Sequence, residues 1–92
     1  MINSFKYRGL KRLFEQSDRS RIGAAFADKV ERILARLDAA TAVEDMNVPG
    51  FGLHRRSGDF SGFWAATVSR NWRVIFRFER GDAHDVGLVD YH

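Results

Sequence analysis

The 92-residue sequence contains no cysteine and only one proline. Without cysteine the chain has no disulfide framework, no thiolate nucleophile and no cysteine metal site, which is typical of a reducing cytoplasm. The first ten residues, MINSFKYRGL, lack the apolar core of a signal peptide, and no apolar run is long enough to span a bilayer. We therefore expect a cytoplasmic protein without a membrane anchor.

Length and composition predict a single domain spanning residues 1–92. Hydrophobic residues make up 45% of the chain and charged residues 29%, which is ordinary for a globular protein that buries a core. The sequence contains neither a low-complexity tract nor an internal repeat, so no linker or second domain is expected.

Positive charge is concentrated in the first part of the chain. Residues 1–37 contain nine lysines and arginines against four acidic residues, a net charge of +5, whereas residues 38–92 have six against eight, a net charge of −2. A basic face suggests a polyanion or an acidic protein as partner. The alternative interpretation is a solvated helix surface rich in lysine and arginine.

Hydrophobic periodicity predicts two helices in the basic part. A short helix over residues 7–16 presents Leu10, Leu13 and Phe14 on one side. A longer helix over residues 24–40 has apolar residues at the same spacing, namely Phe26, Val30, Ile33, Leu34 and Leu37. Pro49 and Gly50 then break the chain and exclude a helix across them.

The rest of the chain has the period of strands. Residues 1–5, 62–69, 72–79 and 84–92 are predicted strands, with a hairpin turn at Gly81 between the last two. Helices first and antiparallel strands afterwards predict an α+β fold, with the two N-terminal helices packed on one face of the sheet.

The last hairpin suggests a register. If residues 80 and 81 form its loop, Arg73 pairs with Leu88 and Asn71 with Asp90. Alternation then places Tyr91 on the opposite face from its neighbours, whereas a three-residue loop would reverse these faces. On this register one face of the sheet gathers two guanidinium groups, a carboxylate and an imidazole: Arg73, Arg77, Asp90 and His92.

Such a group suits RNA cleavage by attack of a ribose 2′-hydroxyl on the adjacent phosphate. Histidine can act as base or acid near neutral pH, and arginine stabilises phosphorane charge without a metal. His54 could supply a second imidazole, and Arg55 and Arg56 could hold the backbone. Each residue also has a structural interpretation: His54 as a surface histidine, Asp90 as an ion-pair partner. A metal site is weakly supported, because no ligand spacing is recognisable.

Residues along the whole chain resemble the HigB-type toxins of the RelE superfamily, which are encoded in bacterial toxin–antitoxin modules. The similarity lies in the order and spacing of short motifs and in the ending Asp-Tyr-His. These motifs are Ile2 to Phe5, Leu37 to Ala40, Pro49 and Gly50, Gly62 and Trp64, Asn71 to Arg73, and Asp90 to His92.

The resemblance implies a compact RelE-like fold with a mixed, mostly antiparallel sheet. It implies a toxin that binds the decoding site of the ribosome and cuts the messenger RNA there, with no metal or cofactor. The implied partner is a HigA-like helix-turn-helix antitoxin, whose complex with the toxin binds operator DNA.

Carried over position by position, the resemblance implies catalytic roles for His54, Arg73, Asp90, Tyr91 and His92. Implied or nearby substrate-binding residues are Arg55, Arg56, Arg70, Asn71 and Arg77.

The chain departs from the family pattern close to the expected RNA groove. A lysine frequent after the histidine is missing, since Arg56, Ser57 and Gly58 stand there, and a basic residue before the asparagine turn is replaced by Ser69. These departures bear on codon preference and catalytic strength. Two other functions stay open: a gyrase poison of the ParE branch, which lacks these histidines, and a basic module that binds RNA or protein.

Overall fold

The computed structural model describes residues 1–58 and 61–90 of the chain. Its sheet has four strands in the order β1-β2-β3-β4, each antiparallel to its neighbour. The elements are helices α1 (Arg8–Gln16) and α2 (Ala24–Ala39), 3₁₀ helix η1 (Val43–Met46), and strands β1 (His54–Arg55), β2 (Trp64–Thr67), β3 (Trp72–Glu79) and β4 (Asp82–Asp90). Within this part of the chain, no helix has the length and apolar character needed to cross a bilayer.

Both predicted helices are confirmed to within one residue at each end. Tyr7 is the residue before α1, and Ser17, in a left-handed conformation with φ of 56°, ends it. The apolar stripe of α2 is buried: Val30, Ile33, Leu34 and Leu37 are each at most 1% exposed. This burial explains why the periodicity of the sequence located α2 correctly.

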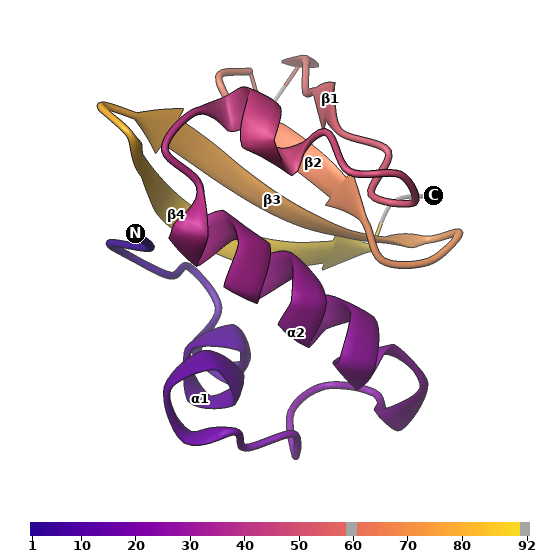
Figure 1. The fold of residues 1–92 in the computed structure, drawn as a ribbon. Coiled ribbons are helices and arrows are strands. Elements are labelled where there is room, and N and C mark those ends of the chain that lie inside the picture. The colour runs from indigo at the N-terminus through magenta and orange to yellow at the C-terminus, as the bar shows by residue number, and fades with distance from the viewer. Residues whose placement is uncertain (59–60, 91–92) are drawn as a thin grey trace.

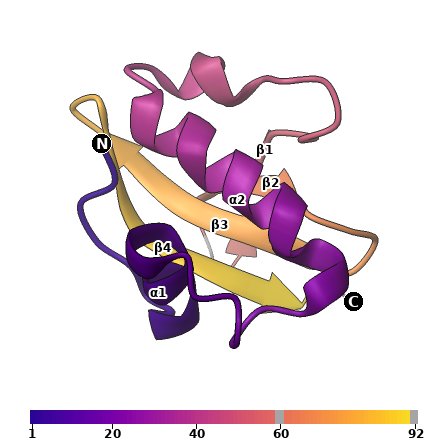
Figure 2. The same cartoon turned by 60° about the horizontal axis from the view of Figure 1, so that its bottom comes forward.

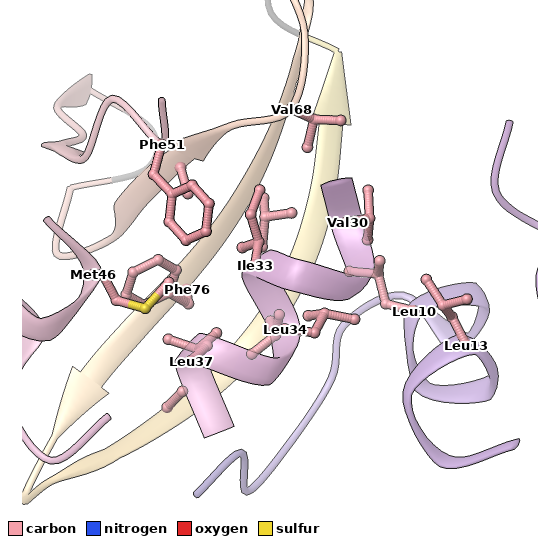
Figure 3. Packing of buried hydrophobic residues seen from close by; sticks show 14 of the residues in the cluster. Leu10, Leu13, Val30, Ile33, Leu34, Leu37, Met46, Phe51, Val68 and Phe76 are labelled. Atoms are coloured by element: carbon pink, nitrogen blue, oxygen red, sulfur yellow. The ribbon is translucent and has the colours of Figure 1, made fainter. Parts of the chain in front are cut away.

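Helix α2 lies across one face of the sheet, and α1 packs beside it near β4 (Figures 1 and 2). One cluster of buried side chains joins both helices to the sheet. In Figure 3 this cluster extends from Leu10 and Leu13 of α1, through α2, to Phe76 of β3 and Met46 of η1. The predicted α+β fold, with two N-terminal helices on one face, is confirmed.

The N-terminal segment forms less regular structure than predicted. In place of a strand over residues 1–5, the structure has two isolated parallel bridges with β4, Ile2 to Ala83 and Phe5 to Val86. The backbone amide of Ile2 also donates to the carboxylate of Asp38 at 3.0 Å, which ties the segment to the end of α2. These parallel bridges give an otherwise antiparallel sheet its mixed character.

The register of the last hairpin is only partly as predicted. Next to the turn, Glu79 pairs with Asp82 and Arg77 with His84, as the two-residue loop implies. Between Ile75 and Arg77 the register shifts by one residue. Asp85, with φ of 53°, is the extra residue on β4 and forms a β-bulge.

The bulge changes which side chains share a face. Beyond it Arg73 pairs with Val89 and Trp72 with Asp90, so the predicted pairs of Arg73 with Leu88 and Asn71 with Asp90 are wrong. Trp72 packs against the core under α2, and its partner Asp90 therefore belongs to that side. Arg73 lies on the opposite side, which we call the open face: the side of the sheet turned away from α2.

The short helix η1, which the sequence analysis missed, is held by one carboxylate. Asp45 accepts hydrogen bonds from the backbone amides of Thr41 and Ala42, at 2.9 and 3.2 Å, and from the Thr41 hydroxyl. The amide of Thr41 contributes most to lowering the pKa of the Asp45 carboxyl below its ordinary value. The fold therefore prefers the ionised form.

Asp45→Asn is expected to lower the melting temperature by a few degrees at neutral pH. Because the pKa is lowered in the folded state, the contribution is complete above the unfolded-state pKa and is lost as pH falls through the folded value. The difference between wild type and variant should therefore narrow at about pH 3. Thermal unfolding followed by circular dichroism at both pH values measures it, and an equal difference at both would contradict this role.

Candidate active site

His54 lies on the edge strand β1 with its side chain exposed. It pairs with Ala65 of β2, which pairs in turn with Ile75 of β3, so the three residues form one row on the open face. The Nδ1 atom of His54 lies 3.0 Å from the carbonyl oxygen of Gly52. The imidazole is thus both accessible to a substrate and held at one nitrogen.

Arg73 also lies on the open face, and its side chain stabilises the turn between β2 and β3. Its Nη1 atom donates to the carbonyl oxygens of Ser69 at 2.6 Å and of Arg70 at 3.1 Å. The exposed residues Arg70 and Asn71 stand on this turn. Arg73 therefore fixes the loop that carries two of the predicted substrate-binding residues.

The sheet places His54 and Arg73 on the same face, with Arg73 two residues along the strand direction from the row of His54. Arg73 pairs with Thr67 of β2, two residues from the partner of His54. With strands about 4.8 Å apart and residues about 3.4 Å apart, their Cα atoms are separated by roughly 12 Å. The two side chains therefore share one face of the sheet but are not in contact through their backbones.

Asp90 is the one predicted C-terminal site residue that the structure describes. Asp90 is exposed at the end of β4, opposite Trp72, which precedes Arg73 on β3. The predicted same-face grouping of Asp90 with Arg73 is wrong in register, although both side chains stand where β3 begins and β4 ends. Tyr91 and His92 lie outside the described residues, and their predicted roles stay predictions.

Arg77 lies near the hairpin turn and is engaged by two acidic side chains. Its Nε atom donates to Asp85 at 2.9 Å and its Nη1 atom to Glu79 at 2.5 Å. The hydrogen bond to Asp85 contributes most to raising the pKa of Arg77 above its ordinary value. Because these two carboxylates offset its positive charge, Arg77 is less suited than Arg73 to binding a phosphate group.

The two arginines beside His54 differ in surroundings. The guanidinium carbon of Arg55 lies 5.3 Å from the centre of the Trp64 ring, within the range of a cation–π contact. Trp64 packs against the core, so Arg55 covers the helix side of the sheet edge. The backbone amide of Arg56 donates to the carbonyl of Phe63 at 2.7 Å. This bond extends the pairing of β1 with β2 by one further hydrogen bond.

Lys6 is a cation of the open face that the sequence analysis missed. Its Nζ atom lies 5.4 Å from the centre of the Phe63 ring. A Cβ atom at Gly87 would lie 3.6 Å from Cβ of Lys6 and 3.5 Å from Ile75, so the lysine stem crosses the row that contains His54. No sequence pattern indicates this position, because it depends on the parallel bridges between the N-terminal segment and β4.

A pocket with a volume of about 420 Å³ lies on the helix side of the sheet. Most of its lining is apolar, with Phe26 and Val30 from α2, Trp72 from β3 and Leu88 from β4. It is therefore separated by the sheet from His54. Within residues 1–58 and 61–90, no three histidine or acidic side chains converge as metal ligands would.

The chain is similar to a known family over nearly its whole length. Residues 3–92 match the family model described as the RelE-like toxin HigB of type II toxin–antitoxin systems. The chain belongs to the HigB-like toxins. A member of the family from Proteus vulgaris, Endoribonuclease HigB, is 41% identical over 92 residues, which is the full length of both chains. Toxin HigB-1 of Vibrio cholerae serotype O1 is 31% identical over 85 residues, 90% of each chain.

Membership in this family confirms the resemblance inferred from the short motifs. It also implies a cognate antitoxin, since the family is defined by toxin–antitoxin systems.

Proposed function

We propose that this chain is an endoribonuclease that cuts messenger RNA in the decoding site of a translating ribosome, and thereby arrests translation and growth. The main support is its 41% identity, over the full length of both chains, to Endoribonuclease HigB. The open face adds physical support, because it carries both the accessible imidazole of His54 and the guanidinium group of Arg73.

The reaction begins with attack of the ribose 2′-hydroxyl on the adjacent phosphate. One of His54 and His92 takes the 2′ proton as general base, and the other protonates the departing 5′ oxygen as general acid. Asp90 orients a histidine or shares the role of base, and Tyr91 positions the attacking nucleotide. Because the nucleophile belongs to the substrate, these groups suffice without a metal ion.

Cations on the open face hold the phosphate backbone. Arg73 stabilises the phosphorane, in which negative charge accumulates. Arg56, Arg70 and Asn71 contact the flanking nucleotides, and Lys6 adds a positive charge on the row of His54. For Arg77 we propose a structural role in place of substrate binding, because Asp85 and Glu79 already engage it.

The antitoxin is proposed to be a HigA-like helix-turn-helix protein whose complex with this toxin binds operator DNA. A ribosome-directed toxin of this kind acts in the cytoplasm, and the antitoxin controls how much of it is free.

Cleavage is expected to depend on the ribosome. A small site with two weak acid–base groups gains most of its rate from a substrate that is already aligned, and the decoding site supplies that alignment. Primer extension on a messenger translated in a purified system should show cuts in phase with codons, whereas the same messenger without ribosomes should stay nearly intact. Rapid cleavage of free messenger would contradict ribosome dependence. Growth arrest without any cuts would point to another target, and gyrase inhibition would then be measured.

A further inference from the structure

The contact between His54 and Gly52 determines which nitrogen of the imidazole exchanges protons. Nδ1 lies 3.0 Å from the carbonyl oxygen of Gly52, and a carbonyl oxygen can only accept a hydrogen bond. In the neutral ring Nδ1 must then carry the hydrogen, which leaves the lone pair on Nε2. We propose that Gly52 is a positioning residue that holds His54 as the Nδ1–H tautomer, so that Nε2 takes up or delivers the proton in RNA cleavage.

The Gly52 carbonyl is held in place from the protein core. Phe51, directly before it, is only 6% exposed and belongs to the core cluster. The carbonyl of Phe51 accepts a hydrogen bond of 2.6 Å from the amide of Thr67 on β2. The segment leading to β1 is thus attached to the neighbouring strand immediately before Gly52, and the imidazole has a fixed acceptor although it is exposed.

Two independent features favour glycine at position 52. Its φ of +56° is the left-handed conformation that L side chains rarely adopt, and a Cβ atom there would lie 2.8 Å from the Thr67 hydroxyl oxygen. A larger residue would therefore strain the backbone whose carbonyl contacts His54, or displace the Thr67 side chain. Because Thr67 pairs with Arg73, the same strand position supports both the histidine and the arginine of the candidate site.

The tautomer can be measured directly in the wild-type protein. An exposed imidazole without such a contact favours hydrogen on Nε2, so a predominantly Nδ1–H form is diagnostic. Long-range ¹H–¹⁵N correlation spectra of ¹⁵N-histidine-labelled protein should be recorded at about pH 8.5, above the ordinary pKa of histidine. A His54→Gln sample assigns the signal. We expect His54 as the Nδ1–H form, and a predominantly Nε2–H form would overturn the proposal.

Gly52→Ala should move His54 towards the Nε2–H form and lower the cleavage rate on the ribosome by about tenfold or more, since acid–base groups contribute about 10² to 10⁴ in rate. Gly50→Ala is the matched control. Gly50 also has a positive φ, of +93°, but a Cβ atom there meets nothing within 4 Å. The control should keep the Nδ1–H form and the cleavage rate. In the double variant Gly52→Ala with Thr67→Ala, the Nδ1–H form and the cleavage rate should both partly return. The single variant Thr67→Ala is the reference against which the double variant is compared.

The role of Gly52 rests on the proposed nuclease function, but the tautomer does not. A wild-type protein with the Nδ1–H form and no cleavage of translated messenger would support the tautomer assignment and overturn the nuclease function. Loss of cleavage in Gly52→Ala with the Nδ1–H form unchanged would overturn the positioning role.

Discussion

His92→Ala is expected to lower the rate of messenger cleavage by about 10² to 10⁴, the contribution of a well-placed acid or base. Under the proposed function the imidazole of His92 exchanges protons with the substrate and is not needed for the packing of the fold. Circular dichroism and the melting temperature should therefore stay as in wild type. Primer extension on translated messenger, together with growth after induction at matched expression, measures the loss.

The chain offers a matched control for this variant in His84. It lies on the same strand that leads to the C-terminus, but pairs with Arg77 near the hairpin turn. His84→Ala removes the same chemical group from the far end of the sheet and should keep codon-phased cleavage. Full growth arrest by His92→Ala at wild-type expression would refute the catalytic assignment, and equal loss in both variants would show that the effect is not local.

Phe76→Ala is expected to reduce the free energy of unfolding by about 3–5 kcal/mol. Phe76 is completely buried and is part of the cluster that joins both helices to the sheet (Figure 3). A domain of this size has a total stability of about 5–15 kcal/mol, so the variant would be partly unfolded at physiological temperature if wild type is near the lower limit. Chemical denaturation should show a lower midpoint with an unchanged slope.

Phe14→Ala provides the comparison for Phe76→Ala. Phe14 is 36% exposed on α1, and its ring centre lies 5.9 Å from that of Phe5. Losing this single aromatic pair should cost about 1 kcal/mol. A similar midpoint shift for both variants would mean that the cluster around Phe76 is not the main source of stability.

The sequence predicted the elements of the fold better than their register. Apolar spacing located α1 and α2 because the buried stripe of each helix is continuous along the chain. Strict alternation likewise located β3. The one-residue shift at Asp85 could not be predicted from the sequence, because polar and apolar residues still alternate on either side of a bulge. What changes across the bulge is the face of the sheet to which each set of residues belongs. An aspartate is among the residues that tolerate positive φ, but this alone does not distinguish a bulge from a turn.

The predicted grouping of the site residues agrees with the structure in one part and disagrees in another. Chemistry and family motifs selected His54 and Arg73, and the structure places both on the open face, while their roles stay predictions. The supporting argument that Asp90 shares the face of Arg73 failed with the register. The sequence analysis missed Lys6 and Gly52 because each acts through contacts between segments that are distant in sequence. Lys6 contacts Phe63, and Gly52 lies close to Thr67.

The bulge at Asp85 also limits how β4 can vary. Removing Asp85 would straighten β4 while Gly87 stays opposite Ile75 and Leu88 opposite Val74, so each later residue would keep its side of the sheet. Straightening the strand with all of its residues kept would be far more disruptive, because Leu88 would move to the open face and Val89 to the side of α2. Substitution of Asp85 by Asn or Gly, which accept the same backbone conformation, is a far smaller change. During divergence we therefore expect position 85 either to be deleted or to hold a residue that accepts a positive φ.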